Sequence, residues 1–337
     1  MEKTGRMALS FISGQSNRTV ALAARVSGIA IAAGGLGLAL RLAGDALGDA
    51  GVYWNGLAIL LGPAIVGGLV VLAGDATAER ASGTPRWQKV AGALALIGVL
   101  ALALKASDSR MIQAGGEIGA WGFLRVVALW LPLAMLLLLS NPGLAFPSRP
   151  LAVFGLIAGT LTILMAVLIS LHTASQAPTW RFWTFLGSVV TPGVMGLLLV
   201  TASLDRLPLD LLRIRSWSLA TAGLVVVGVV VHSLWLADRV PHDGSWIAVG
   251  NVASRLTFAL LILVVARAIP TVLGIATAIG ISVALYAHAV WLTSTMDDPD
   301  DPVWILLLIT TSSVAFAVLA VFLCLRRRLD ARSFVAH

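Results

Sequence analysis

The sequence predicts an all-α, polytopic membrane protein, a bundle of about ten transmembrane helices, and its composition, its apolar runs and its basic residues all favour this class. Of the 337 residues, 58% are hydrophobic and 12% are charged, and the mean hydropathy is +0.95. Soluble domains are about 45–50% apolar and about 25% charged. The chain is therefore too apolar for a soluble fold, and we expect the lipid bilayer to surround most of it.

Ten apolar runs are each about as long as a spanning helix, which needs about 20 residues to cross the hydrocarbon core. These runs cover residues 19–40, 54–73, 88–104, 122–140, 151–171, 183–203, 217–236, 247–267, 269–291 and 303–325. The connections are short, so we expect one transmembrane domain, 19–325, between a cytoplasmic N-terminal segment, 1–18, and a basic cytoplasmic tail, 326–337. The polar N-terminal segment lacks the pattern of a cleaved signal peptide, so the first run is expected to remain a span.

The basic residues predict that both termini are cytoplasmic. With the N-terminus inside, sixteen of the 23 lysines and arginines fall on the inner side, six fall on the outer side, and Arg255 lies within the membrane. Lysine and arginine favour the cytoplasmic side of a membrane. We therefore expect a multi-pass protein of a bacterial cytoplasmic (inner) membrane. The formal charge of +7 reflects this topology and gives no reason to expect nucleic acid as a partner.

Two features of the runs predict packing. The first run contains Gly28, Gly34, Gly35 and Gly37 among alanines, which lets helix backbones approach closely, so we expect this helix inside the bundle. Cys324 is the single cysteine of the chain and cannot form an intrachain disulfide. We expect it to be a small buried side chain.

The runs that cross from the outer to the inner side share a pattern. Each begins near a tryptophan, namely Trp54, Trp121, Trp183, Trp246 and Trp304. Each also carries a special feature near its middle, namely Pro63, Pro132, Pro192, Arg255 and the hydroxyl run Thr310, Thr311, Ser312 and Ser313. An aromatic belt at the interface is expected in any membrane protein, but it does not explain why the second feature recurs at a similar depth.

These mid-membrane features predict a substrate path. Proline removes a backbone hydrogen bond and bends a helix, and irregular backbone in a bilayer is tolerated where it packs on protein or lines a cavity. Transporters place their binding sites at this depth. The alternative is that the prolines only shape helix packing, because proline is common in spanning helices.

Arg255 is the residue with the clearest functional implication. It lies about eight residues below the outer boundary of its run, which corresponds to about 12 Å at 1.5 Å per residue. A guanidinium at this depth costs several kcal/mol unless it has a partner. We expect the partner to be a loop carboxylate such as Glu117 or Asp238, a carbonyl or hydroxyl group, or a bound anion. The alternative is a structural role, with the side chain snorkelling toward the interface.

Histidine and tryptophan gather at the outer ends of several runs. The candidates for quinone binding, proton transfer or haem b ligation there are His172, His232, His288, Trp180, Trp235 and Trp291. His232 and Trp235 are three residues apart, as are His288 and Trp291, so each pair lies on one helix face at a similar depth. The alternative is that these are ordinary interface residues, in which case no cofactor is expected.

Known catalytic and nucleotide-binding motifs are absent from the sequence. There is no phosphate-binding loop, no serine nucleophile elbow and no His-Glu-x-x-His metal motif. We therefore expect no catalytic residues, no metal site and no self-contained enzyme. The acidic loop at 297–301 could hold a divalent cation, but an exposed acidic loop on the outer side is the simpler interpretation.

Part of the chain resembles the membrane-anchor subunit of DMSO-reductase-type molybdoenzymes. The residues that carry the resemblance are Pro178-Thr179-Trp180, Trp183-Thr184, Gly193 and Gly196, with the pair Arg255 and Pro270. The resemblance implies a quinol-oxidising anchor that works near the outer face and covers eight of the ten spans. The Leu-Gly-x-Pro loop of that family and its late Gly-Glu and Arg signature with Phe-Tyr have no counterpart here.

The number and direction of the spans also resemble the tellurite-resistance and slow-anion-channel family, which has ten helices with both ends inside. The resemblance is one of architecture, and no distinctive motif of that family is present. The prolines of this chain fall on the spans that run from outside to inside, whereas that family kinks its pore-lining helices elsewhere.

The leading functional hypothesis is a small-solute or anion transporter or channel, with a path near the mid-membrane features. The alternative is a quinol-reactive membrane anchor subunit of a molybdoenzyme-type oxidoreductase, for which quinone or haem b is the expected cofactor. A third hypothesis is an assembly or interaction protein without a substrate. The expected partners are lipid, a small anionic or polar solute, and either further copies of the chain or catalytic subunits.

Overall fold

The protein is all-helical in the part of the chain that the structure describes. The computed structural model describes residues 2–44, 50–75, 85–107, 119–141, 143–207, 211–239, 244–295 and 301–335. Ten of its helices are long and apolar enough to cross a membrane, namely Arg18–Arg41, Gly56–Gly74, Arg86–Ser107, Ala120–Leu139, Arg149–Ser175, Arg181–Leu204, Arg213–Arg239, Gly244–Val265, Thr271–Ser294 and Val303–Arg327. The prediction of an all-α chain with ten spans is confirmed, and each span overlaps the apolar run expected for it.

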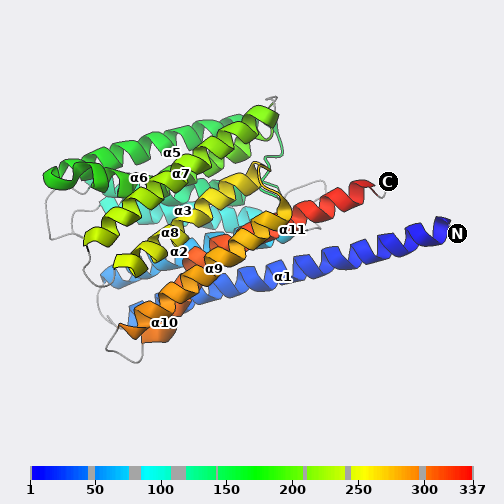
Figure 1. Cartoon of the computed structure of the whole chain (residues 1–337), viewed down its shortest axis with the longest axis horizontal. Helices are drawn as coiled ribbons and strands as arrows, with labels where there is room; N and C mark the ends of the chain where they lie inside the picture. The colour runs from blue at the N-terminus through cyan, green and yellow to red at the C-terminus, as the bar shows by residue number, and fades with distance from the viewer. Residues whose placement is uncertain are drawn as a thin grey trace.

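The spans alternate in direction between the two ends of the bundle. Helices that run one way are α1 (Glu2–Gly44), α3 (Arg86–Ser107), α5 (Arg149–Ser175), α7 (Leu211–Arg239) and α9 (Thr271–Ser294). Helices that return are α2 (Ala50–Gly74), α4 (Gly119–Leu139), α6 (Arg181–Leu204), α8 (Gly244–Val265) and the consecutive α10 (Asp301–Ile309) and α11 (Ala315–Val335). Both termini lie at one end of the bundle (Figure 1). We call it the inner end and the opposite end the outer end, after the orientation expected from the sequence.

The returning helices form a closed ring. Helix α2 contacts α4, α4 contacts α6, α6 contacts α8, α8 contacts α11, and α11 contacts α2. The helices that run the other way lie outside this ring, and we call them the outer helices, whichever end of the bundle is meant. Each outer helix packs against two successive ring helices: α3 on α2 and α4, α5 on α4 and α6, α7 on α6 and α8, α9 on α8 and α11, and α1 on α11 and α2. We take the 18-residue apolar window of each span as its measure of burial. In ring helices 44–61% of the residues in this window are buried, and in outer helices 28–33%. The described helices thus form hairpins arranged in a closed cycle, and the repeated sequence pattern marks the ring helix of each hairpin.

Four of the ring helices are irregular or bent near their middle. Pro63, Pro132 and Pro192 lie inside α2, α4 and α6, where each removes one backbone hydrogen bond. The last ring helix has a π-helical turn, Thr310–Val314, between α10 and α11. The hydroxyls of the first three residues of this turn donate to carbonyls four residues earlier, an interaction that bends helices. The fifth ring helix, α8, carries Arg255 at the equivalent level.

Close backbone contact at glycine holds the hairpins together. A side chain at Gly28 of α1 would meet the carbonyl oxygen of Gly67 in α2. Gly159 of α5 and Gly196 of α6 face each other in the same way, each Cβ position lying within 2.9 Å of the other carbonyl oxygen. Small residues allow such contacts, and in a bilayer they replace the hydrophobic effect as the cause of helix association. The close approach expected for the first span is confirmed.

Helix α1 does not, however, lie inside the bundle, as its glycines led us to expect. Only 28% of its apolar window is buried, and Leu22, Val26 and Ile29 are each more than 60% exposed. Its small residues occupy the face toward α2 and α11, while large apolar side chains that suit lipid occupy the opposite face. Composition alone does not distinguish such a helix from one that is small on every side.

Replacing Gly28 by alanine should weaken the α1–α2 pair. The added methyl group would meet the Gly67 carbonyl, so the helices must separate, and overpacking of this kind costs about 1–3 kcal/mol. Cys324 is fully buried, as the sequence predicts, and its reaction with a thiol-reactive fluorophore in detergent reports unfolding. We expect G28A to lower the thermal midpoint measured in this way.

Gly223→Ala in α7 is the matched control for G28A. No atom lies within 4 Å of a Cβ at this position, and alanine is the better helix former, so the midpoint should stay the same or rise. Equal midpoints for G28A and the parent protein would contradict the importance of the close α1–α2 contact.

Candidate functional site

The ring helices change from partly exposed to buried along their length. In the outer half of α6, residues 183–189 are all partly exposed, and seven consecutive residues cover every face of a helix. In the inner half of the same helix, residues 193–196 are all buried. In the other ring helices, too, the residues change from mostly partly exposed to mostly buried. The change falls at Leu61 in α2, Pro132 in α4, Gly193 in α6, Thr257 in α8 and Val314 in the last ring helix. Each of these positions is within two residues of a mid-helix feature predicted from the sequence.

The inner half of the ring is a dry apolar core. Leu69, Leu136, Leu198 and Leu261 come from four different ring helices, and each is 0–1% exposed. Each of these side chains is closed off from solvent by its neighbours. The side chains of the outer half remain more accessible.

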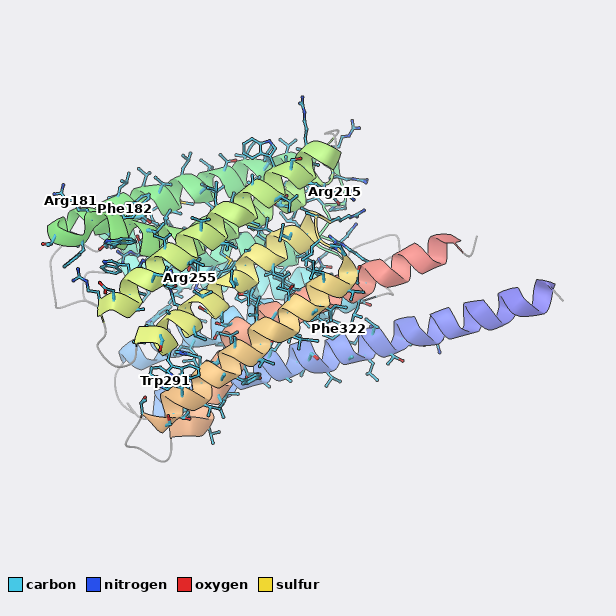
Figure 2. All side chains as sticks on the ribbon, viewed as in Figure 1. Arg181, Phe182, Arg215, Arg255, Trp291 and Phe322 are labelled. Atoms are coloured by element: carbon cyan, nitrogen blue, oxygen red, sulfur yellow. The ribbon has the colours of Figure 1, made fainter. Side chains whose placement is uncertain are left out.

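Arg255 of α8 lies at the boundary between the two halves (Figure 2). Its side chain is half-buried, and Nη2 donates a long hydrogen bond, 3.5 Å, to the carbonyl oxygen of Gly187 in α6. Nη1 is buried and has no hydrogen-bond partner among the residues that the structure describes. Of the carboxylates considered as partners, Asp238 is exposed at the outer end of α7, and Glu117 lies outside the described residues.

Other polar groups lie near Arg255 on helices α6, α7 and α8. The imidazole of His232 in α7 packs on Gly187, where a Cβ would lie 2.6 Å from Cε1. Asn251, one helical turn before Arg255, donates its amide to the hydroxyl of Ser233. Helices α6, α7 and α8 therefore bring together Gly187, His232, Ser233, Asn251 and Arg255, which we call the Arg255 cluster.

Tryptophans at the outer ends of α7 and α9 occupy equivalent positions. Trp235 of α7 stacks on Trp183 of α6, with ring centroids 5.3 Å apart and planes 12° apart. Trp291 of α9 stacks on Trp246 of α8 at 6.0 Å and 10°, at the outer end of the bundle (Figure 2). Two neighbouring hairpins thus repeat one contact between a ring helix and the outer helix that follows it.

The histidines repeat as well. His288 packs on Gly250 of α8 as His232 packs on Gly187 of α6, and both glycines come four residues after the ring tryptophan. The centroid of each imidazole lies 5.4–5.7 Å from that of the tryptophan three residues later. The two imidazoles therefore belong to separate clusters, each against the α-carbon of its own ring helix.

Two further ring tryptophans are covered from the next outer helix. Trp121 of α4 stacks on His172 of α5, with centroids 4.1 Å apart and planes 9° apart. Arg41 of α1 lies over Trp304 of α10, 4.4 Å from the ring centroid. The sequence indicates the common level of these groups but not their partners. A sequence signal does exist for the pairs Trp183–Trp235 and Trp246–Trp291. It is Trp-x-x-x-Gly in a ring helix followed by His-x-x-Trp in the next helix.

The remaining outer-side candidate, Trp180, lies outside this repeat. It ends the short 3₁₀ helix η2 (Pro178–Trp180), which precedes α6. The guanidinium of Arg239 lies 3.5 Å from the centroid of its ring. A cation over an indole in this position is typical of the membrane interface.

Several of the mid-helix residues point toward outer helices. A Cβ at Gly35 of α1 would lie 2.5 Å from the Pro63 ring. A Cβ at Gly34 of the same helix would lie 2.5 Å from Thr311. Thr310 shares a hydrogen bond of 3.0 Å with Tyr286 of α9. The other mid-helix residues are the buried Pro132 and the half-buried Pro192, Ser312 and Ser313. Pro63, Thr310 and Thr311 thus contact outer helices.

Within the Arg255 cluster, Arg255 Nη1 is a buried donor without a partner among the described residues, and such a donor suits an anion or a carbonyl oxygen. No group of three or more histidine, cysteine, aspartate or glutamate residues that could hold a metal ion occurs among the described residues. Residues 297–300 of the acidic loop and His242 lie outside the described part of the chain.

The spans define the class of protein. Ten apolar spans that alternate in direction make the chain a multi-pass membrane protein. Comparison with models of protein families, with curated proteins and with solved structures finds no match to the chain.

Replacing Gly187 by alanine should disturb the α6–α7 contact through His232. The new methyl group would lie 2.6 Å from the imidazole, so either the ring must move or the helices must separate. We expect a lower thermal midpoint for G187A. Adding His232→Ala should restore most of the loss, because substitutions at two touching sites are coupled.

Gly193→Ala on the same helix is the control, because the nearest atom to its Cβ position is at an ordinary 4.0 Å. Should H232A fail to restore the midpoint of G187A while G193A behaves like the parent, the packing of the imidazole on Gly187 is not what the substitution disturbs.

Proposed function

We propose that the protein is a transporter or channel for a small anionic or polar solute that enters the ring from its outer end. One observation carries the proposal: all the ring helices change from partly exposed to buried at the level of their mid-helix features. A central vestibule that is open in the outer half and closed by apolar packing in the inner half accounts for this common change. Contact with lipid does not, because the outer helices keep one buried and one exposed face along their length.

Arg255 supplies the positive charge at the level where this vestibule ends. Its long hydrogen bond to Gly187 and its buried, unpartnered Nη1 favour a further acceptor, either an anion or a carbonyl oxygen. No described carboxylate forms an ion pair with Arg255. A charge that is not neutralised nearby attracts anions into a narrow opening and repels cations.

The irregular helices give the ring a means of opening. Prolines and π turns are the usual sites of helix bending. Here they lie on the outer side of the buried leucines that fill the inner half of the ring. A change of bend at several of these points would move the inner halves apart as hinged segments. Passage of solute would then require the dry inner core to separate while the hairpin contacts stay in place.

Cysteine accessibility tests the vestibule. In a Cys324→Ala background, Ser188→Cys and Ser203→Cys place thiols in the outer and inner halves of α6, and Val230→Cys places one on the exposed face of α7. We expect a charged methanethiosulfonate reagent, supplied to both sides of the membrane, to modify S188C alone. Water reaches the vestibule, whereas Ser203 is 0% exposed and Val230 faces lipid.

The lipid-facing control is matched for depth. Val230 is five residues before Trp235, Ser188 is five residues after Trp183, and these two tryptophans stack. Val230 is 36% exposed, so only lipid keeps a charged reagent from it. Modification of V230C as fast as S188C, or no modification of S188C, would contradict a water-filled vestibule.

Substitution of Arg255 tests the chemical class of the solute. Arg255→Gln removes the charge, while Arg255→Lys keeps it and loses the planar set of donors. In proteoliposomes assayed with chloride, nitrate, acetate and phosphate, we expect R255Q to reduce anion flux about tenfold or more, the scale of one charge-assisted hydrogen bond. R255K should retain part of the flux, and both variants should reach the membrane normally.

Arg181→Gln is the control for R255Q, because Arg181 is an exposed arginine at the outer end of α6 (Figure 2). It removes the same charge without touching the Arg255 cluster. Parent-like flux in both Arg255 variants would make the residue structural, and a parent protein that moves none of the four anions would count against an anion path.

A quinol-reactive membrane anchor is the second candidate, and one observation favours it. His232 and His288 are each packed between a glycine and a tryptophan, and each Nδ1 is buried with no hydrogen-bond partner in the described part of the chain. A neutral imidazole in such a setting can donate to a quinone carbonyl. A solvent extract and an optical spectrum of the purified protein separate the two functions, since quinone or haem b that copurifies favours the anchor and its catalytic subunits.

A further inference from the structure

His232 of α7 and Arg255 of α8 approach the same residue of α6. A Cβ at Gly187 would lie 2.6 Å from Cε1 and 2.8 Å from Nε2 of His232, and the carbonyl oxygen of Gly187 lies 3.5 Å from Arg255 Nη2. The carbonyl oxygen and the Cβ of one residue are about 3 Å apart, so the imidazole and the guanidinium are at most about 9 Å apart. Charges act on each other over this distance even in salt solution, where the screening length is about 10 Å at about 0.1 M.

Both side chains have a buried nitrogen without a hydrogen-bond partner among the described residues. These atoms are Nδ1 of His232 and Nη1 of Arg255, and His232 is only 7% exposed. A buried polar group without a partner is costly, and two of them in one cluster favour a ligand. An anion offers acceptors both to the guanidinium and to a protonated imidazole, which donates from both of its nitrogens.

Few other charges lie on the helices packed against His232. Helix α7 packs on α6 and α8, of which α6 carries Arg181, exposed at its outer end, and α8 carries only Arg255. On α7 itself, Asp238 and Arg239 are exposed at the outer end. A proton on His232 would therefore place a second positive charge near Arg255, and no described carboxylate pairs with either group. A bound anion would offset the repulsion between the two cations.

We propose that an anion bound at Arg255 is accompanied by a proton on His232, so that the solute crosses the membrane together with a proton. This inference rests on the proposed anion path. The proton comes from a hydronium ion at the outer end, occupies the second nitrogen of the imidazole while the anion is bound, and leaves with the anion at the inner end. A monovalent anion then crosses without net charge. Because linkage is reciprocal, the anion must bind more tightly at acid pH, where His232 is protonated.

The simpler role of His232 is to fill the space beside Gly187, as His288 of α9 fills the space beside Gly250. That role predicts no pH dependence. Gly250 and Arg255 are five residues apart on α8, which is about 140° around the helix, so His288 contacts a different face from the one that carries Arg255. His288 is therefore the matched control, with the same packing and no neighbouring guanidinium.

The test measures nitrate binding to the protein in nanodiscs by isothermal titration calorimetry from about pH 8 to about pH 5.5, the range in which histidine titrates. Nitrate keeps its single charge throughout. We expect the Kd of the parent to fall about tenfold toward acid pH, within the range typical of coupling between sites. The binding enthalpy near pH 6.5 should vary with the ionisation enthalpy of the buffer, because a proton is taken up with the anion.

His232→Gln should remove both the pH dependence and the buffer dependence and keep the affinity that the parent has at about pH 8. His288→Gln should keep both. Should H232Q fail to fold, proton uptake by the parent decides the question, because it needs no variant. In proteoliposomes, an inward nitrate gradient should acidify the lumen with the parent and with H288Q, above the background of protein-free liposomes.

The outcomes separate this inference from the proposed function. Nitrate binding that does not depend on pH or buffer, or a loss of pH dependence in H288Q as large as in H232Q, overturns the proton coupling and leaves the anion path standing. A parent protein that binds neither nitrate nor chloride at any pH overturns the anion path and the coupling together.

Discussion

Backbone contact between the two helices of a hairpin is the interaction on which the rest of the structure depends. Inside a bilayer, apolar side chains gain little by exchanging lipid for protein, so helices associate through dispersion contacts that require close approach. Gly28 with Gly67, and Gly159 with Gly196, bring the backbones of their hairpins that close. Helices α1 and α5 thereby become fixed supports, and the ring helices that they hold, α2 and α6, can be irregular without losing their positions.

That support explains why the interruptions lie in the ring and not in the outer helices. A bent helix exposes backbone groups that have lost their partners, and in lipid each such group costs several kcal/mol. Helix α1 covers the bend at Pro63 with Gly35, and Tyr286 of α9 bonds to Thr310 at the π turn. The outer helices therefore separate irregular backbone from hydrocarbon, and the same arrangement leaves the inner faces of the ring free to differ between their two halves.

The sequence predicts features that depend on short stretches of chain and misses those that depend on neighbours. Helix number follows from hydropathy over about 20 residues, and the depth of Pro132 or Arg255 follows from counting down from an interfacial tryptophan. Membership of the ring is different, because α1 is rich in glycine and still lies outside. Arg255 bonds to the carbonyl oxygen of Gly187, a group that every residue has, so no pattern of side chains could have indicated that partner.

The contacts that close the ring join the first and last parts of the chain. Helix α11 packs against α2, and Arg41 of α1 lies over Trp304 of α10. Because the N-terminal part of a chain is made first, the flanks of α2 and α8 that α11 covers must face lipid or another protein until the final span has been inserted. A nascent chain that stalls before this step has four hairpins in an open arc. The closed inner half of the ring therefore forms only after the span Val303–Arg327 has been inserted.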